Sequence, residues 1–244
     1  MTSQLDNCIV GILKEDTDQY VGLGLLINAE YIVTCAHVVN AVLNRPQDTI
    51  EKPDEESVIR FTFPKKKAGK AIFSAKIKHW QPRGRRFYQI DDFAILCINE
   101  YELLQYIEIP PFIIPESFLN REILAFGFPQ ERKSNGKHII GVCIDADAIG
   151  LVEIIDKNKG ELFIKEGFSG SPVFDIASNA VIGIICSKIA KIKDTGHMLP
   201  LEIIHDTWDE FQLSGRKIRS PKAIKQEREQ EALNKRLNTL EDGL

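Results

Sequence analysis

The sequence lacks an excess of positive charge and has no long apolar run. Lys and Arg total 31 against 35 for Asp and Glu among 244 residues, a formal net charge of −4. Nucleic-acid-binding proteins usually carry a basic excess that neutralises phosphates. No apolar run approaches the ~20 residues of a membrane helix, and the amino-terminal segment lacks the basic stretch and apolar core of a secretory signal. We therefore expect a cytoplasmic protein that binds neither nucleic acid nor membrane.

Cysteines are also few, and their arrangement excludes the usual cysteine-built sites. They are odd in number and widely spaced, and no two form a CxxC pair, so the spacing of a structural zinc site is absent. Each lies in an apolar run, which predicts small buried residues with reduced thiols, as in a reducing compartment. We expect no metal and no cofactor. The five are Cys8, Cys35, Cys97, Cys143 and Cys186.

What the sequence does contain is a series of short apolar runs separated by turn residues. Runs of about 4–8 residues rich in Val, Ile and Phe at this spacing are typical of an all-β sandwich or barrel. Residues 107–117 carry several prolines, and because proline breaks strand pairing we expect a connector between two β-modules there. The runs cover residues 8–13, 22–27, 31–36, 57–63, 93–98, 122–128, 138–144, 151–155, 161–165, 171–176 and 180–186.

The pattern changes after residue 200. Apolar residues recur there every three or four positions, which predicts a helix over 201–213 that docks on the β-core. Residues 214–244 form a charged tail whose leucines are too few for a coiled coil. A solvent-exposed helix and a linker helix leading to a partner or a further domain both remain open. The two apolar sets are Leu201, Ile204, Trp208 and Phe211, and then Leu233, Leu237, Leu240 and Leu244.

Three local sequences carry residues suited to nucleophilic catalysis. His37 follows one apolar run, Asp92 opens another, and Ser169 stands between glycines in EGFSGSPVF. Glycines around a serine indicate a tight turn that exposes backbone N–H groups. No one of the three motifs is specific alone. Their order, His then Asp then Ser, distinguishes one class of serine protease from the others.

The chain resembles the trypsin-like serine peptidases of the chymotrypsin fold, and most closely their compact intracellular or bacterial branch. The resemblance covers about residues 8–204 and implies two six-stranded antiparallel β-barrels with an active site in the cleft between them. We expect a peptidase domain over 6–213, with barrels over about 6–105 and 118–200. The matching motifs are TCAHVV (34–39), DFAIL (92–96), AFGFP (125–129) and GFSGSPVFD (167–175).

The resemblance implies a serine endopeptidase that hydrolyses peptide bonds in protein substrates through an acyl-enzyme. A serine hydroxyl is a weak nucleophile at neutral pH and needs an adjacent base. In the family pattern His37 takes the proton of Ser169, and Asp92 fixes the tautomer of the imidazole and stabilises its protonated form. Asp91 is the alternative to Asp92. The backbone N–H groups of Gly167 and Ser169 form the oxyanion hole.

Two departures from the family pattern bear on activation and compartment. Digestive and clotting relatives hold an Asp directly before the nucleophile, and it pairs with a new amino terminus made by zymogen cleavage. Here that residue is Phe168. We therefore interpret Ile9 as part of an ordinary first strand and expect activity without cleavage before it. The cysteine that usually follows the catalytic His is Val38, so the disulfide around that His is absent, as a reducing compartment requires.

Substrate preference is weakly encoded in the sequence. In the family the base of the pocket for the substrate side chain lies six residues before the nucleophile, and here that residue is Phe163. Trypsin-like cleavage, which needs a carboxylate there, is therefore not expected. The far wall of the pocket is expected to involve Cys186, Ser187 and Lys188, and a lysine at the rim favours acidic residues.

Partners are expected from context as well as from charge. The basic runs at 63–70 and 83–87 are interpreted as solvated loops, with an acidic partner or exosite as the alternative. Trypsin-like domains of this branch occur beside sensor modules in bacterial conflict systems. We therefore expect a regulatory or sensor protein that acts through the tail in a bacterial defence or stress setting. A catalytically silent binding module on the same fold is the alternative function.

Overall fold

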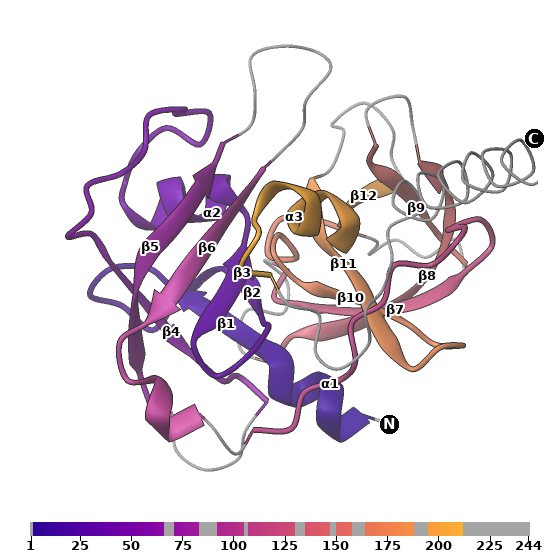
Figure 1. The fold of residues 1–244 in the computed structure, drawn as a ribbon, viewed down its shortest axis with the longest axis horizontal. Helices are drawn as coiled ribbons and strands as arrows, with labels where there is room; N and C mark the ends of the chain where they lie inside the picture. The colour runs from indigo at the N-terminus through magenta and orange to yellow at the C-terminus, as the bar shows by residue number, and fades with distance from the viewer. Residues whose placement is uncertain are drawn as a thin grey trace, which may run out of the picture.

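The protein is built from two closed six-stranded β-barrels that lie side by side (Figure 1). The computed structural model describes residues 2–65, 71–82, 92–104, 107–129, 135–146, 150–157, 164–187 and 195–211. The first barrel has the order β1-β2-β3-β6-β5-β4, with β1 Ile9–Leu13, β2 Tyr20–Leu26, β3 Tyr31–Thr34, β4 Val58–Thr62, β5 Phe73–Gln81 and β6 Phe93–Ile98. The second has the order β10-β11-β12-β9-β8-β7, with β7 Glu122–Gly127, β8 Lys137–Ala146, β9 Val152–Asp156, β10 Pro172–Asp175, β11 Ala180–Ser187 and β12 Thr195–Pro200. This architecture confirms the predicted fold class.

Short helices flank the barrels. Figure 1 shows α1 below the barrels near β1, α2 beside the first barrel, and α3 in front of the region where the barrels meet. Among the described residues, no helix is long and apolar enough to cross a membrane. The helical segments are α1 Thr2–Cys8, α2 Ala36–Val42, a 3-10 turn Tyr101–Leu104, and α3 Leu201–Thr207.

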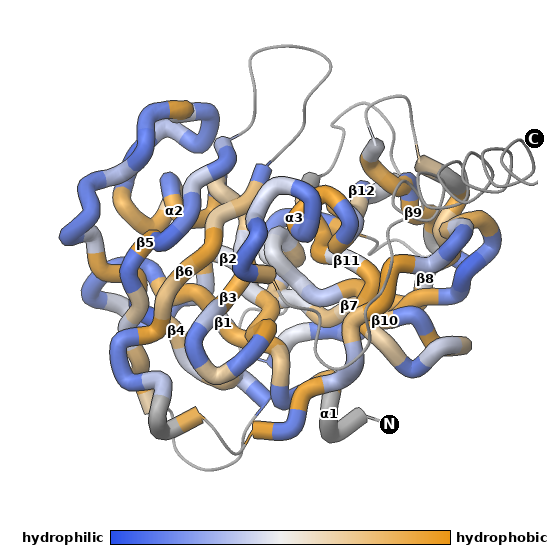
Figure 2. Tube along the Cα trace, in the orientation of Figure 1, coloured by the Kyte–Doolittle hydropathy of each residue, from blue (hydrophilic) through white to orange (hydrophobic). Residues whose placement is uncertain are grey.

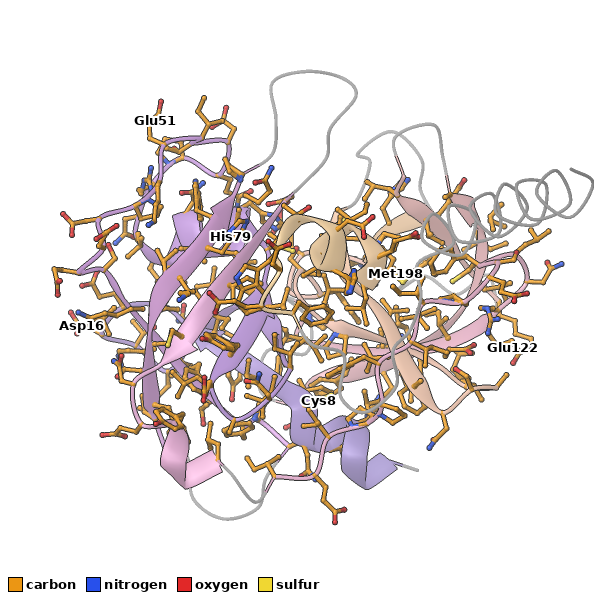
Figure 3. All side chains as sticks on the ribbon, viewed as in Figure 1. Cys8, Asp16, Glu51, His79, Glu122 and Met198 are labelled. Carbon is orange, nitrogen blue, oxygen red and sulfur yellow. The ribbon has the colours of Figure 1, made fainter. Side chains whose placement is uncertain are left out.

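Apolar side chains fill both barrels. Figure 2 shows hydrophobic residues along the strands and hydrophilic ones on many of the outer loops. Phe61 and Phe93 are fully buried in the first barrel, while Ile154 and Met198 are fully buried in the second. In Figure 3, Met198 lies within the second barrel and Glu122 lies at its outer edge. The cores form because inward-facing positions along each strand are apolar.

The cysteines are free, and four of them are buried as expected. Cys8 ends α1, and Cys35 lies between β3 and α2, so these two are not within strands. Cys143 and Cys186 are fully buried in β8 and β11, and Cys97 is partly exposed in β6. The barrels are therefore held together without disulfides among the described cysteines.

Two strands and two helices were not among the predicted elements. β5 and β12 alternate apolar with polar or small residues, in FSAKIKHWQ and TGHMLP, and so form no continuous apolar run. The run predicted at 31–36 ends as a strand at Thr34, because α2 begins at Ala36. α1 precedes the first strand where no helix was expected. Of the run at 161–165, only residues 164 and 165 are described, and they lie outside any strand.

The proline-bearing connector has no strand of its own, as predicted, but it pairs with β11. Phe112 forms an isolated parallel bridge with Val181. The Ile113 N–H donates to the Val181 carbonyl at 3.0 Å, and the Val181 N–H donates to the Pro111 carbonyl at 2.9 Å. Phe112 is buried. The connector therefore contributes to the core instead of crossing open solvent.

The carboxy-terminal helix is shorter than the apolar spacing predicts. α3 ends at Thr207, because Trp208 adopts an extended backbone with φ −129° and ψ 104°. Trp208 and Phe211 are nevertheless buried, and the Trp208 ring meets Tyr31 of β3 edge-on at 5.0 Å between centroids. The Tyr31 hydroxyl donates to Glu210 at 3.2 Å. This segment thus packs on the first barrel, and the tail at 214–244 lies outside the described residues.

Phe61→Ala is expected to lower the free energy of unfolding by about 3–5 kcal/mol, because it leaves a cavity in the first barrel. The Phe61 ring stacks on that of Phe73 at 5.5 Å between centroids. Urea unfolding followed by tryptophan fluorescence measures the change. Val58→Ala on the same strand is the control: Val58 is 48% exposed, so its truncation is expected to cost under about 0.5 kcal/mol. Equal losses in the two variants would contradict this placement of the core.

Candidate active site

Strand pairing brings His37 and Asp92 together. At the end of β3, Thr34 pairs with Ala94 near the start of β6, so the segments that follow β3 and precede β6 are neighbours. The His37 Nδ1 lies 2.5 Å from the Asp92 Oδ2, and the His37 backbone N–H donates to Oδ1 of the same carboxylate at 3.0 Å. The Asp92 side chain is 3% exposed and that of His37 is 20% exposed. A buried carboxylate therefore orients a histidine whose ring reaches solvent, and the alternative Asp91 lies outside the described residues.

The first barrel also holds the turn that carries Ser169. The Leu23 N–H of β2 donates to the Ser169 carbonyl at 2.8 Å, and the Gly170 N–H donates to the Ile185 carbonyl at 2.7 Å. A Cβ on Gly170 would lie 1.8 Å from the Leu23 carbonyl oxygen, and its φ is +83°. Only glycine allows so close an approach at such a backbone angle. The turn is thus held between β2 of one barrel and β11 of the other.

Gly22 lies between the segments that carry His37 and Ser169. A Cβ on Gly22 would lie 2.7 Å from the Cγ2 of Val38 and 3.0 Å from the Ser169 carbonyl oxygen. Val38 is the residue after His37. The absence of a side chain at Gly22 therefore lets α2 and the serine turn pack against the same point of β2.

Gly167, two residues before Ser169, has a backbone conformation that favours glycine. Gly167 has a φ of +96°, and a Cβ there would lie 2.1 Å from the Phe128 carbonyl oxygen. Within the described part of the chain, no carbonyl or side-chain acceptor takes a hydrogen bond from the N–H of Gly167 or of Ser169. Two N–H donors at a tight turn therefore stay available to an oxygen of a bound molecule.

Cys35 is a neighbour of this pair that sequence reasoning did not identify as part of the site, since its apolar context indicated burial only. Ligand atoms of Cys35, His37 and Asp92 lie within 4.8 Å of one another. Burial raises the pKa of the Cys35 thiol well above its ordinary value, and the charge of Asp92 raises it further. The protonated Cys35 thiol donates a hydrogen bond to the Ile185 carbonyl at 3.3 Å. A coordinating thiol must lose its proton, which burial of Cys35 opposes.

The predicted substrate pocket is only partly within the described residues. Cys186 is fully buried, and its Sγ lies 3.5 Å from the His197 carbonyl oxygen. Ser187 ends β11, whereas Phe163 and Lys188 lie outside the described residues. Because two of the four pocket residues are not described, the pocket and the substrate preference stay predictions.

His79, labelled in Figure 3, lies on β5 and contacts Phe93, the residue that follows Asp92. Its ring stacks on that of Phe93 at 5.6 Å between centroids. Its Nε2 is buried and has no hydrogen-bond partner among the described residues. Loss of hydration lowers the pKa of His79, and the charge of Lys52 lowers it further. The His79 imidazole therefore packs against the first residue of β6, directly after the Asp92 carboxylate.

The two barrels define a chymotrypsin-like serine protease fold. The sequence profile of the trypsin-like peptidase domain matches residues 22–184, and the chain belongs to that family. This match confirms the resemblance inferred from the motifs. No curated protein sequence matches the chain.

Solved structures of distant proteases share the fold. The MamO protease domain of Magnetospirillum magneticum is 16% identical, with a TM-score of 0.60 over 85% of this chain and 99% of that one. A serine endoprotease of Yersinia pestis is 15% identical, with a TM-score of 0.59 over 88% of this chain and 66% of that one. The Rv3671c protease of M. tuberculosis, in its active form, is 15% identical, with a TM-score of 0.56 over 86% and 83%. At such identities the likeness concerns the fold alone.

The free energy of unfolding is expected to fall as the pH decreases below about 6.5, the ordinary histidine pKa. The lowered pKa of His79 means that the unfolded chain binds a proton there more readily than the folded protein does. His79→Leu removes this titration, so its stability is expected to change less between about pH 7.5 and pH 5.5. Urea unfolding at both pH values measures the difference, with His205→Leu as the control at a partly exposed position of α3. Equal pH dependence in His79→Leu and the wild type would contradict the assignment.

Cys35 is expected to resist alkylation in the folded protein, because its thiol is buried and its pKa is raised. Iodoacetamide at mildly alkaline pH should modify Cys97, which is partly exposed, and leave the four buried cysteines intact. Peptide mass spectrometry identifies the modified residues, and the same reaction in concentrated urea should reach all of them. Cys97→Ser should remain unlabelled when folded. Rapid native labelling of Cys35 would show that the thiol is accessible to solvent.

Proposed function

We propose that the protein is a serine endopeptidase in which His37, Asp92 and Ser169 form the catalytic triad. The observation that carries the proposal is the buried Asp92 carboxylate bound to both the Nδ1 and the backbone N–H of His37. The packing of Gly22 between Val38 and the Ser169 carbonyl supports it, because the segment after His37 and the serine turn then contact the same residue of β2. Membership of the trypsin-like peptidase family supports the reaction class.

The arrangement is suited to acyl transfer. The Ser169 Oγ attacks the carbonyl carbon of the scissile peptide, and its proton passes to the Nε2 of His37. The His37 Nδ1–H donates to Asp92, which holds the tautomer with a free Nε2 and stabilises the imidazolium. The same proton then leaves with the amine product, and water, activated by His37, hydrolyses the ester on Ser169.

The oxyanion is assigned to the backbone N–H groups of Gly167 and Ser169. They carry no other acceptor among the described residues, and the positive φ of Gly167 gives its peptide an orientation that other residues rarely adopt. Removing one donor of this kind typically costs about 10²–10³ in kcat. Main-chain donors have a further advantage, since no side-chain rotamer has to be ordered when the negative charge forms.

The finer parts of the prediction remain predictions. They are a peptidase unit over 6–213, a cytoplasmic location, a pocket that includes Phe163 and Lys188, and a regulatory partner that binds the tail at 214–244 in a defence or stress setting. Phe163, Lys188 and the tail lie outside the described residues.

A fluorophosphonate probe is expected to label the wild type at Ser169 and to leave Ser169→Ala unlabelled. Asp92→Asn should lower kcat/KM on an unfolded protein such as casein by about 10⁴-fold, because the histidine then takes the wrong tautomer. Gel fluorescence and peptide mass spectrometry report the labelled residue, and fluorescent casein reports hydrolysis.

Ser57→Ala is the matched control, since Ser57 lies in a loop before β4 and contacts no residue of the site. It should label and cleave as the wild type does. A wild type that is never labelled would favour the alternative, a silent binding module. Labelling that persists in Ser169→Ala would show that the nucleophile is another residue.

A further inference from the structure

The end of β7 is joined to the serine turn at three successive positions. The Phe126 N–H donates to the Ser171 Oγ at 3.2 Å, and the Phe128 N–H donates to the Gly167 carbonyl at 3.0 Å. Between them lies Gly127, whose Cβ, if present, would be 2.5 Å from the ring of Phe168. We call this contact of residues 126–128 with residues 167–171 the β7 seam.

Phe168 is the central element of the β7 seam. Its side chain is fully buried in the second barrel, among apolar neighbours that include Val173 and Ile182. Its own backbone closes the turn, since its N–H donates to the Lys165 carbonyl at 3.2 Å and its carbonyl accepts from Ser171 at 2.9 Å. Burial of a phenylalanine side chain stabilises the segment that carries it. The turn is therefore anchored by apolar packing at the residue between the two proposed oxyanion donors.

The amino-terminal segment is built into the fold. Ile9 is fully buried and pairs with Leu25 of β2, so it is held within the first barrel. α1 precedes it, with Leu5 buried in the core and the Asn7 side chain donating to the Glu108 carbonyl at 3.0 Å. A new amino group at Ile9 would thus begin in a barrel strand, and Phe168 offers it no carboxylate.

We propose that Phe168 is a positioning residue that keeps the oxyanion turn assembled by apolar packing, so that activity requires neither a charged partner at this position nor cleavage before Ile9. This regulation concerns the site of the proposed function and rests on it. When the ring holds the turn against Gly127, the N–H groups of Gly167 and Ser169 are ordered before substrate binds. Such ordering lowers the barrier of the chemical step more than it strengthens substrate binding.

Phe168→Ala is expected to lower kcat on a peptide substrate by about 10²–10³-fold, the effect of a lost oxyanion donor, while KM changes by less than about threefold. Phe118→Ala is the matched control. Phe118 is buried in the same core, so its loss destabilises the barrel by a similar mechanism but should leave kcat near that of the wild type. Phe168→Leu restores most of the apolar volume and is expected to recover kcat to within about tenfold.

A second measurement reports on the β7 seam without activity. The Phe128 amide donates to Gly167, so its hydrogen exchange is expected to be slow in the wild type and in Phe118→Ala, and fast in Phe168→Ala. Intact-mass analysis of the fluorophosphonate-labelled wild type is expected to show residues 1–8 still attached.

The outcomes separate the two proposals. A wild type that is labelled at Ser169, together with unchanged kcat and unchanged Phe128 exchange in Phe168→Ala, overturns the positioning role and leaves the peptidase proposal standing. Activity found only in protein cleaved before Ile9 also overturns it. Absence of labelling overturns the peptidase proposal, and fast Phe128 exchange in Phe168→Ala would then support the β7 seam as a structural contact alone. If Phe168→Ala does not fold, Phe168→Leu decides: its kcat should lie below that of Phe118→Ala, and its Phe128 amide should exchange faster than in Phe118→Ala. Values equal to those of Phe118→Ala would overturn the positioning role.

Discussion

The contact between β2 and the serine turn is the constraint on which the rest of the site depends. His37 belongs to the first barrel and Ser169 to the second, so no local sequence can set the distance between them. β2 limits this distance from one side. The Leu23 N–H donates to the Ser169 carbonyl, and the Val38 side chain packs against the neighbouring Gly22, which has no Cβ. A larger residue at Gly22 would push the two segments apart. Gly22 and Leu23 of β2 thus bring the segment that carries His37 and the turn that carries Ser169 against the same strand.

In the described part of the protein, the segments around His37 and Ser169 are held together without disulfides. Its cysteines are free, and Val38 stands where the family usually places the cysteine that clamps the histidine. Van der Waals contact with Gly22 joins β2 to α2 at this point. Thr34 adds a buried hydrogen bond, since its hydroxyl donates to the Leu23 carbonyl at 2.6 Å. Close packing and satisfied polar groups give small, distributed contributions, which suits a chain whose thiols are expected to stay reduced.

The sequence predicted the architecture well where strands are continuously apolar. β1, β6 and β11 coincide closely with apolar runs, and the proline-bearing connector lies between the two barrels as expected. The prediction failed where the signal is weaker. β5 and β12 mix polar residues with apolar ones. Several positions of β5 are only partly buried, whereas residues 196–200 of β12 are all buried. α2 is a helix of only seven residues embedded in a sequence that favours strands. α3 is shorter than its apolar spacing, since Trp208 is buried by packing on Tyr31 and not by continuing the helix.

The sequence by itself determined the family and the identity of the candidate residues, because the motifs around His37, Asp92 and Ser169 are local and their order along the chain is characteristic. The tertiary structure decided which groups meet. Asp92 is 55 positions from His37, and their contact follows from the register of β3 with β6. The positions of Cys35 beside Asp92 and of Phe168 against Gly127 also have no local signature. Such contacts depend on how strands pair and barrels pack, and those arrangements result from the burial of many residues at once.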